Sequence, residues 1–121
     1  MNKESVETGQ MIESYKFVGE DFKALMQYEG WKIGFLRYSE RFSEFSQLEM
    51  HSLTDEAFIL LEGSATLYTE NENVNMEKCV LYNIPKGEWH HITVSKDATV
   101  MVVENSNTSK ENTKKRYLRG E

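Results

Sequence analysis

Histidine is rare in this sequence, and its histidines are the side chains best suited to chemistry. The 121-residue chain has three of them, His51, His90 and His91. Acidic residues flank the first, since Glu49 lies two positions before it and Glu56 five positions after it. Neutral imidazoles and carboxylates together are common ligands of Fe(II), Mn(II), Ni(II) and Zn(II). These residues therefore form a candidate metal site.

The two-residue period of a β-strand decides which of these side chains can meet. Residues i and i+2 share a face, so Glu49 and His51 can point the same way. His90 and His91 are adjacent and must point to opposite faces, and His90 lies on the more apolar side of its segment. We expect one inward cluster of Glu49, His51, Glu56 and His90. The alternative is that each histidine is an ordinary hydrogen-bonded strand residue and each acid is solvated.

The elements that position these residues are expected to be short strands. Apolar segments bounded by turn residues predict strands near 31–38, 46–51, 57–61, 65–69, 80–84, 89–94 and 99–104. The turn at 62–64 predicts a hairpin of 57–61 with 65–69, whereas the polar segment 70–75 is expected to be a turn. Apolar residues at helical spacing in 20–28 predict one short N-terminal helix. Seven or eight short strands predict an all-β, antiparallel sandwich or barrel.

Composition indicates a packed, single-domain protein of the cytoplasm. Hydrophobic residues make up 39% of the chain and aromatic residues 12%. The longest apolar runs, 57–61 and 100–103, are far shorter than the ~18–20 residues that span a membrane. The first ten residues have no apolar segment typical of a secretory signal. The single cysteine, Cys79, allows no intrachain disulfide and is expected to be a small buried hydrophobe.

Charge is unevenly distributed along the chain. The net charge is −6, yet residues 110–121 carry five basic and two acidic groups. The acidic remainder disfavours binding to nucleic acid. We expect the basic end to be solvated or folded onto the acidic body, and we expect neither nucleic-acid nor membrane partners.

The spacing of the candidate ligands resembles the two sequence motifs of the cupin family. His51, four residues, Glu56, six residues and then Gly63 is similar to the later half of the first motif. The sequence from Pro85 to His90 is similar to the P-x-G-x-x-H core of the second motif. The intervening segment of 21 residues is typical of small bacterial cupins.

The chain thus resembles a small single-domain cupin of the RmlC-like type. The resemblance implies an all-β fold, an antiparallel double-stranded β-helix or jelly-roll barrel, here with a short N-terminal helix. It divides the chain into a leader and short helix at 1–30, a cupin barrel at 31–105 and a polar, basic tail at 106–121.

The resemblance also implies a site and a range of functions. The metal ligands would be Glu49, His51, Glu56 and His90, with Glu49 as ligand or as catalytic general base. Glu49 stands where the family usually has a histidine, and Val94 where it usually has an asparagine. A carboxylate in place of an imidazole shifts the metal preference of the site toward harder ions such as Mn(II), Fe(II) or Zn(II). The expected function is a metal-dependent enzyme of the dioxygenase, decarboxylase or isomerase type, acting on a small polar metabolite.

Two other functions stay open. One is a non-catalytic cupin that binds a sugar or carboxylate without metal, and the other is a metal-free, epimerase-like enzyme. Because open antiparallel sheets need protected edges, a closed barrel or a homodimer is expected. Four residues are candidates for an apolar dimer face or, alternatively, for a second core layer: Leu48, Met50, Ile59 and Leu61. On the segment 31–38, either Trp31, Ile33, Phe35 and Arg37 face inward, or Lys32, Leu36 and Tyr38 do.

Overall fold

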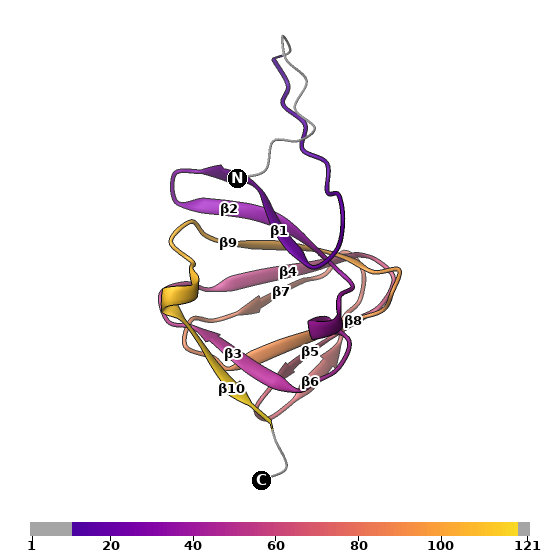
Figure 1. Cartoon of the computed structure of the whole chain (residues 1–121), viewed down its shortest axis with the longest axis vertical. Coiled ribbons are helices and arrows are strands. Elements are labelled where there is room, and N and C mark those ends of the chain that lie inside the picture. Colours follow the sequence, from indigo (N-terminus) through magenta and orange to yellow (C-terminus); the bar gives the residue numbers. More distant parts are fainter. Residues whose placement is uncertain (1–10, 119–121) are drawn as a thin grey trace.

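The computed structural model describes residues 11–118 and confirms the all-β prediction (Figure 1). That span contains no α-helix. Its elements are β1 (Phe22–Tyr28), β2 (Trp31–Arg37), the 3-10 helix η1 (Glu40–Phe42), β3 (Gln47–His51), β4 (Glu56–Glu62), β5 (Ala65–Thr69), β6 (Asn73–Asn75), β7 (Leu81–Ile84), β8 (His90–Val94), β9 (Thr99–Asn105), the 3-10 helix η2 (Lys110–Asn112) and β10 (Thr113–Tyr117).

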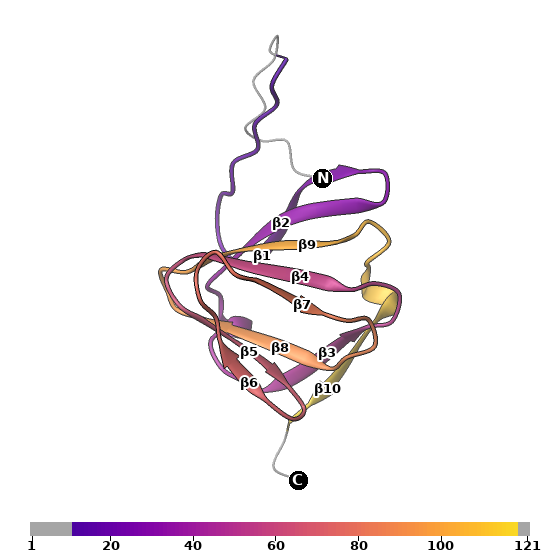
Figure 2. The same cartoon turned by 180° about the vertical axis from the view of Figure 1, so that it is seen from behind.

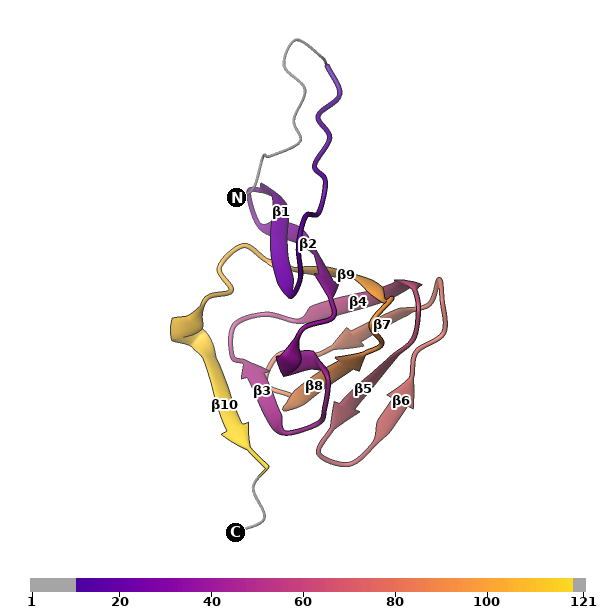
Figure 3. The ribbon, with the colours of Figure 1, turned by 45° about the vertical axis from the view of Figure 1, so that its right-hand side comes forward.

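The strands form two five-stranded sheets that face each other (Figures 1 and 2). One sheet has the order β1-β2-β9-β4-β7 and the other the order β10-β3-β8-β5-β6. All neighbouring strands within the sheets pair antiparallel. From β3 to β10 the chain crosses between the sheets at every connection except β5 to β6, and Figure 3 shows these crossings from the side. This winding is the double-stranded β-helix that the resemblance to the cupin motifs implies.

The hydrophobic core lies between the two sheets. Alternate residues of each strand point into it, as the strand period requires. Val100 and Val102 of β9 are 0% and 1% exposed. The β1-β2-β9-β4-β7 sheet also contributes Phe58, whereas Ile92 and Val94 come from the facing sheet. On β2, Leu36 packs in this core, which selects the second of the two orientations considered for that strand.

Residues 22–28 form strand β1, so the predicted N-terminal helix is wrong. β1 pairs antiparallel with β2, and the register shifts between Ala24 and Met26. This bulge leaves Leu25 as an extra residue and displaces the side-chain alternation by one position. The apolar residues on both sides of the bulge therefore have the spacing of a helix, although the backbone is extended.

The predicted hairpin of 57–61 with 65–69 is also wrong. A turn does lie between these segments, and Gly63 occupies it with a φ of +73°. However, β4 and β5 belong to different sheets, so the turn carries the chain around a corner of the barrel. A Cβ atom on Gly63 would lie 2.6 Å from the Ala98 Cα atom, which explains why a glycine stands at this corner.

Two further strands occur in polar segments. β6 lies where the sequence predicts a turn, and β10 lies within the segment expected to be a tail. Both are edge strands without apolar alternation, so the hydrophobic pattern does not mark them. β10 pairs with β3 along its whole length, which places the basic residues 114–116 beside the strand that carries His51.

Among residues 11–118, no helix has the length and apolar character to cross a membrane. Cys79 is exposed and does not take the buried position expected for it.

Candidate metal centre

The corner between β3 and β4 positions the first two candidate ligands. His51 is the last residue of β3 and Glu56 is the first of β4. Both are buried, with 8% and 9% of their surface exposed. Their side chains meet inside the barrel, where His51 Nε2 lies 3.0 Å from Glu56 Oε1.

Three hydrogen bonds connect that corner to the end of β7 and to the turn before β8. The backbone N–H of Gly87 donates to the carbonyl of His51 over 2.9 Å. The backbone N–H of Lys86 donates to Asp55 Oδ1, also over 2.9 Å, and the Asn83 amide donates to Asp55 Oδ2. The hydrogen bond from Lys86 is the main reason that the pKa of Asp55 is lowered. Asp55 therefore acts as the turn residue that holds the two motif segments together.

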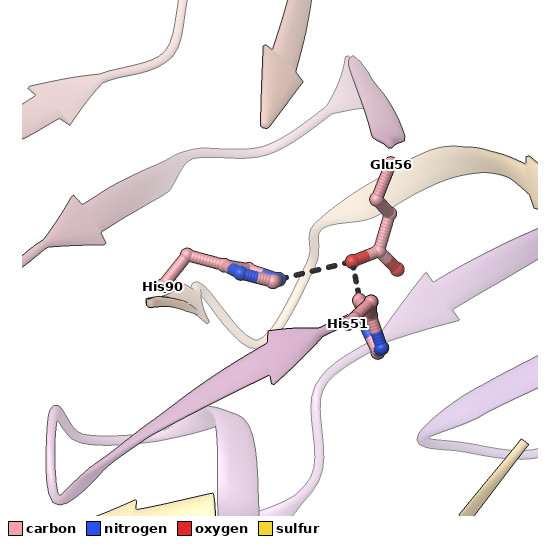
Figure 4. Close-up of side chains that lie close together, drawn as sticks. All are labelled: His51, Glu56 and His90. Carbon is pink, nitrogen blue, oxygen red and sulfur yellow. Dashed lines mark hydrogen bonds and ion pairs between the residues drawn. The ribbon is translucent and has the colours of Figure 1, made fainter. Parts of the chain in front are cut away.

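His90 enters the site from the first position of β8. Its Cα partner on β3 is Glu49, and its side chain faces the barrel interior. His90 Nε2 lies 3.0 Å from Glu56 Oε1, the same oxygen that His51 approaches. Figure 4 shows the two rings converging on this carboxylate from two strands. One ligand atom from each of the three residues lies within 4.8 Å of the others.

The outer nitrogen of each imidazole is held by a hydrogen-bond acceptor. The carbonyl of Glu88 accepts from His90 Nδ1 over 3.1 Å. The Thr113 hydroxyl donates to the Ser109 carbonyl over 2.7 Å, so it accepts from His51 Nδ1 over 2.9 Å. Both rings therefore carry a proton on Nδ1. In the neutral tautomer this leaves a lone pair on each Nε2.

Two lone pairs and a carboxylate oxygen therefore converge on one buried point. Burial alone would lower the pKa of His51, but the acidic residues around it, Glu56 foremost and then Glu104 and Glu49, together outweigh that effect and raise it. Burial alone would raise the pKa of Glu56, but the hydrogen bonds that both histidines donate from Nε2 when they are protonated hold it well below its usual range. Such a group requires positive charge at its centre, which protons or a metal ion can provide.

Glu104 is a site residue that the sequence prediction missed, and its neighbour Lys32 was an inward candidate in one of the two orientations considered for its strand. Glu104 on β9 is the Cα partner of Glu56 on one side and of Lys32 on the other. Lys32 Nζ lies 3.7 Å from Glu104 Oε2. Burial, followed by the proximity of Glu56, raises the pKa of Glu104 to about 8. The available signal was parity, because Glu104 follows Val100 and Val102 at two-residue steps on an inward face.

Glu49, predicted as ligand or base, lines the same cavity but lies outside the three-residue group. Its Oε2 accepts a hydrogen bond from the Gln47 amide over 2.9 Å and lies 3.5 Å from Arg41 Nη1. His91 points away from the group, as the strand period predicted. It packs against Phe42 and Phe45, and burial lowers its pKa.

A cavity of about 640 Å³ adjoins the three-residue group. Its lining has a charged part and an apolar part. The charged part includes Lys32, Glu49 and Glu104, beside the group itself. The apolar part consists of Phe22, Leu36, Phe42, Phe58, Ile92 and Val102. A small molecule with both polar and apolar portions can be accommodated here.

Comparison with known proteins supports the fold. No protein-family model matches the sequence, and neither does any curated protein. Solved structures do match. A cupin-2 domain protein from Shewanella frigidimarina is 22% identical with a TM-score of 0.62, over 74% of this chain and 84% of that one. An RmlC-like cupin with a double-stranded β-helix from Methanocaldococcus jannaschii is 17% identical with a TM-score of 0.62, over 80% and 93% of the two chains.

A third similar structure is Pac13, a nucleoside dehydratase. It is 14% identical with a TM-score of 0.61, and the match covers 88% of this chain and 92% of Pac13. Identities at this level establish the fold and not the activity. The chain has the fold of the small, RmlC-like cupins.

Proposed function

We propose that the chain binds a divalent metal ion through His51 Nε2, the Glu56 carboxylate and His90 Nε2. The proposal rests mainly on one observation. Acceptors hold both Nδ1 atoms, so both Nε2 lone pairs are directed at the same buried carboxylate oxygen. Hydrogen bonding of the outer nitrogen is the usual way in which proteins orient metal-binding histidines.

The donor set limits the choice of ion. Two imidazoles and one carboxylate suit Fe(II), Mn(II), Ni(II) or Zn(II) and leave coordination positions open. A bound ion would supply Lewis-acid or oxygen-activating chemistry. Glu49 stays a predicted general base or fourth ligand. It lines the cavity as the direct cross-strand partner of His90. For either role, its carboxylate would have to break the hydrogen bond from Arg41.

We further propose that the cavity receives a small polar metabolite and that the reaction is of the dioxygenase, decarboxylase or isomerase type. The cavity offers Lys32 and Glu104 as polar contacts opposite apolar side chains. Pac13 has been solved with uridine, a small polar molecule with a planar ring. That likeness supports the size and character of the ligand but not its identity.

A second candidate function is a metal-free cupin that binds a sugar or carboxylate. One observation favours it. When both imidazoles are protonated, Glu56 accepts a hydrogen bond from each, and the three side chains satisfy one another without an ion. A thermal-shift screen separates the two functions, because only ligands that prefer the folded protein raise its melting temperature. Stabilisation by sugars or carboxylates without any response to metals would favour the metal-free function.

The direct test is elemental analysis of the protein reconstituted with each ion. We expect about one ion per chain in the wild type, in line with a single site. Asparagine in place of His51 or His90 keeps a donor near the Nδ1 position and removes Nε2. H51N and H90N should therefore fold and bind the ion much more weakly, each through one imidazole in place of two. The matched control is H91N, which should retain it. A wild type without metal after reconstitution, or an H90N variant that binds as well as the wild type, would overturn the proposal.

A further inference from the structure

The inward face of the β1-β2-β9-β4-β7 sheet carries a row of three charged side chains. Strand register makes Lys32 on β2 the Cα partner of Glu104 on β9, and Glu104 the Cα partner of Glu56 on β4. All three line the cavity. Side chains directly opposite each other on one sheet face are in contact distance. The row therefore runs without interruption from Lys32 to the carboxylate of the candidate metal centre.

The facing sheet carries a second row with the same order of charges. Lys115 on β10 is the Cα partner of Glu49 on β3, and Glu49 is the Cα partner of His90 on β8. These three residues also line the cavity. Each row thus consists of a lysine, a glutamate and a candidate metal ligand. Two lysines, one from each sheet, lie at the ends of the rows that are farther from the candidate metal centre.

Lys32 is the more enclosed of the two lysines. Its side chain is 17% exposed, whereas Lys115 is an exposed residue. The ammonium group of Lys32 has three N–H donors, and one of them donates to the Thr108 carbonyl over 3.0 Å. Glu104 Oε2 lies 3.7 Å from Lys32 Nζ, which is beyond ordinary hydrogen-bond distance. Because Lys32 lines the cavity, a ligand there can accept a further hydrogen bond from it.

The charges around the cavity favour an anionic ligand. Among residues 11–118, three basic side chains line it, Lys32, Arg41 and Lys115, and so do three glutamates. A bound divalent ion would therefore give the cavity a net charge of at least +2 when the histidines are neutral. The whole chain, by contrast, has a net charge of −6. Positive charge is thus concentrated where a ligand would bind.

The available donors suit a carboxylate better than a phosphate. Phosphate sites usually combine several backbone N–H groups at a helix N-terminus, or use an arginine side chain that donates twice. Residues 11–118 contain no α-helix. Arg41 already donates from Nε and Nη2 to the two carboxylate oxygens of Asp21, over 2.9 and 3.1 Å. The lysines remain, and a single ammonium group matches a singly charged carboxylate.

Apolar side chains lie directly beside the charged row. In the next inward row of the same sheet, Val102 and Phe58 are Cα partners, and both are buried and line the cavity. Gly34 is the third member of that row. A Cβ atom on Gly34 would lie 2.6 Å from Phe22 Cε1, so the absence of a side chain there leaves room for the Phe22 ring, which also lines the cavity.

We propose that the cavity binds a small organic acid, with its carboxylate on the Lys32 ammonium group and its apolar part against Phe22 and Phe58. This inference rests on the proposed function, because it names the class of molecule that the cavity receives. Strands ~4.8 Å apart place the Cα atoms of Lys32 and Glu56 about 10 Å from each other. An acid anchored at Lys32 can therefore extend past Glu104 to the candidate metal centre. Lys115 attracts anions toward the cavity.

Calorimetric titration with benzoate and phenylacetate, each compared with its uncharged amide, tests the assignment. Both acids are ionised at neutral pH, and each should bind at least about tenfold more tightly than its amide, the effect of one charge-assisted hydrogen bond. K32M removes the ammonium group and should abolish this preference, whereas K32R should still prefer the acids. The matched control is K78M, since Lys78 is exposed and does not line the cavity, and its preference should equal that of the wild type.

Titrations of metal-loaded and chelator-treated protein distinguish this inference from the proposed metal site. Lys32 is not one of the three metal-binding candidates, so K32M should take up as much metal as the wild type in elemental analysis. A wild type without metal would contradict the metal site, while an acid preference that depends on Lys32 would still support the anchor. A preference that persists in K32M and disappears with the chelator would show that the carboxylate binds the metal, and would overturn the inference.

Circular dichroism checks that each variant is folded. If K32M does not fold, K32Q replaces it, because its amide can still donate to the Thr108 carbonyl. Phenyl phosphate that binds more tightly than benzoate would overturn the choice of a carboxylate. A wild type that binds the acids no more tightly than the amides would show that Lys32 only compensates the charge of Glu104, and would also overturn the inference.

Discussion

His51 and His90 direct their Nε2 atoms at one shared carboxylate oxygen, which lies 3.0 Å from each. The rings come from neighbouring strands, β3 and β8, and the Nδ1 atom of each is held by a separate acceptor. The rings are therefore oriented by contacts that do not involve the shared oxygen. Such an arrangement lowers the cost of binding an ion, because the ligands do not have to be ordered first.

Metal binding is expected to weaken as the pH falls from about 8 to about 6, because protons compete for the Nε2 lone pairs. The raised pKa of His51 extends this competition above the usual histidine range. If both rings must lose a proton, the affinity falls by up to about 100-fold per pH unit at the acid end. Calorimetric titration with Zn(II) or Mn(II) at several pH values measures the effect. An affinity that is the same at both ends of the range would contradict it.

Replacing Glu104 with glutamine is expected to stabilise the metal-free protein at about pH 8 and to change little near about pH 5. In the folded protein the pKa of Glu104 is raised to about 8 from the ordinary value of 4.5. The folded state therefore holds a proton that the unfolded state has released, and stability falls as the pH rises between these values. Glutamine cannot ionise, so this loss is absent in E104Q. At about pH 8 its free energy of unfolding should exceed that of the wild type by on the order of 2 kcal/mol.

Urea denaturation of E104Q at the two pH values checks this expectation, with a chelator present throughout. The matched control is E77Q, since Glu77 is exposed and its replacement should change stability by less than about 0.5 kcal/mol at either pH. An E104Q variant that is less stable than the wild type at the alkaline pH would show that the buried carboxylate is stabilising.

Asp55 is expected to affect metal affinity without contacting the metal. Its carboxylate accepts hydrogen bonds from the Lys86 backbone and the Asn83 side chain, which fixes the turn that leads to His90. D55A should weaken metal binding about tenfold, the scale seen when groups that support ligands are removed. D55N retains an acceptor oxygen and should restore most of the affinity. If D55A binds metal as the wild type does, the turn is held by other contacts.

Alanine at Gly63 is expected to destabilise the protein by about 2 kcal/mol or more, because φ is positive and the new Cβ would meet the Ala98 backbone. The matched control is G30A, since a Cβ at Gly30 meets no atom within 4 Å. The control should stay within about 0.5 kcal/mol of the wild type. Urea unfolding midpoints compare the two variants, and equal midpoints would be inconsistent with a tight corner at Gly63.

The sequence predicted those parts of the molecule that depend on short-range spacing. His51 and Glu56 flank one turn and His90 follows another, and strand parity together with the resemblance to the cupin motifs grouped them, with Glu49, in one predicted site. Glu104 was missed because its relation to Glu56 is a cross-strand pairing between β4 and β9, which nothing local in the sequence reveals. Nothing local in the sequence reveals the hydrogen bond from Arg41 to Glu49 either.

The errors in the fold have equally physical origins. The bulge at Leu25 gave a strand the apolar spacing of a helix. Gly63 signals a turn, but a turn residue does not reveal whether the next strand joins the same sheet or the other one. β10 is a polar edge strand, and its pairing with β3 is determined by the partner and not by its own pattern.

The central claim is that His51, Glu56 and His90 bind one metal ion. X-ray absorption at the K edge of the metal, measured on the reconstituted protein, tests it most directly because it reports the ligands of the bound ion. We expect nitrogen and oxygen ligands with the scattering signature of two imidazole rings, reduced to one ring in H90N. A spectrum without imidazole scattering, or one that is unchanged in both H51N and H90N, would contradict it.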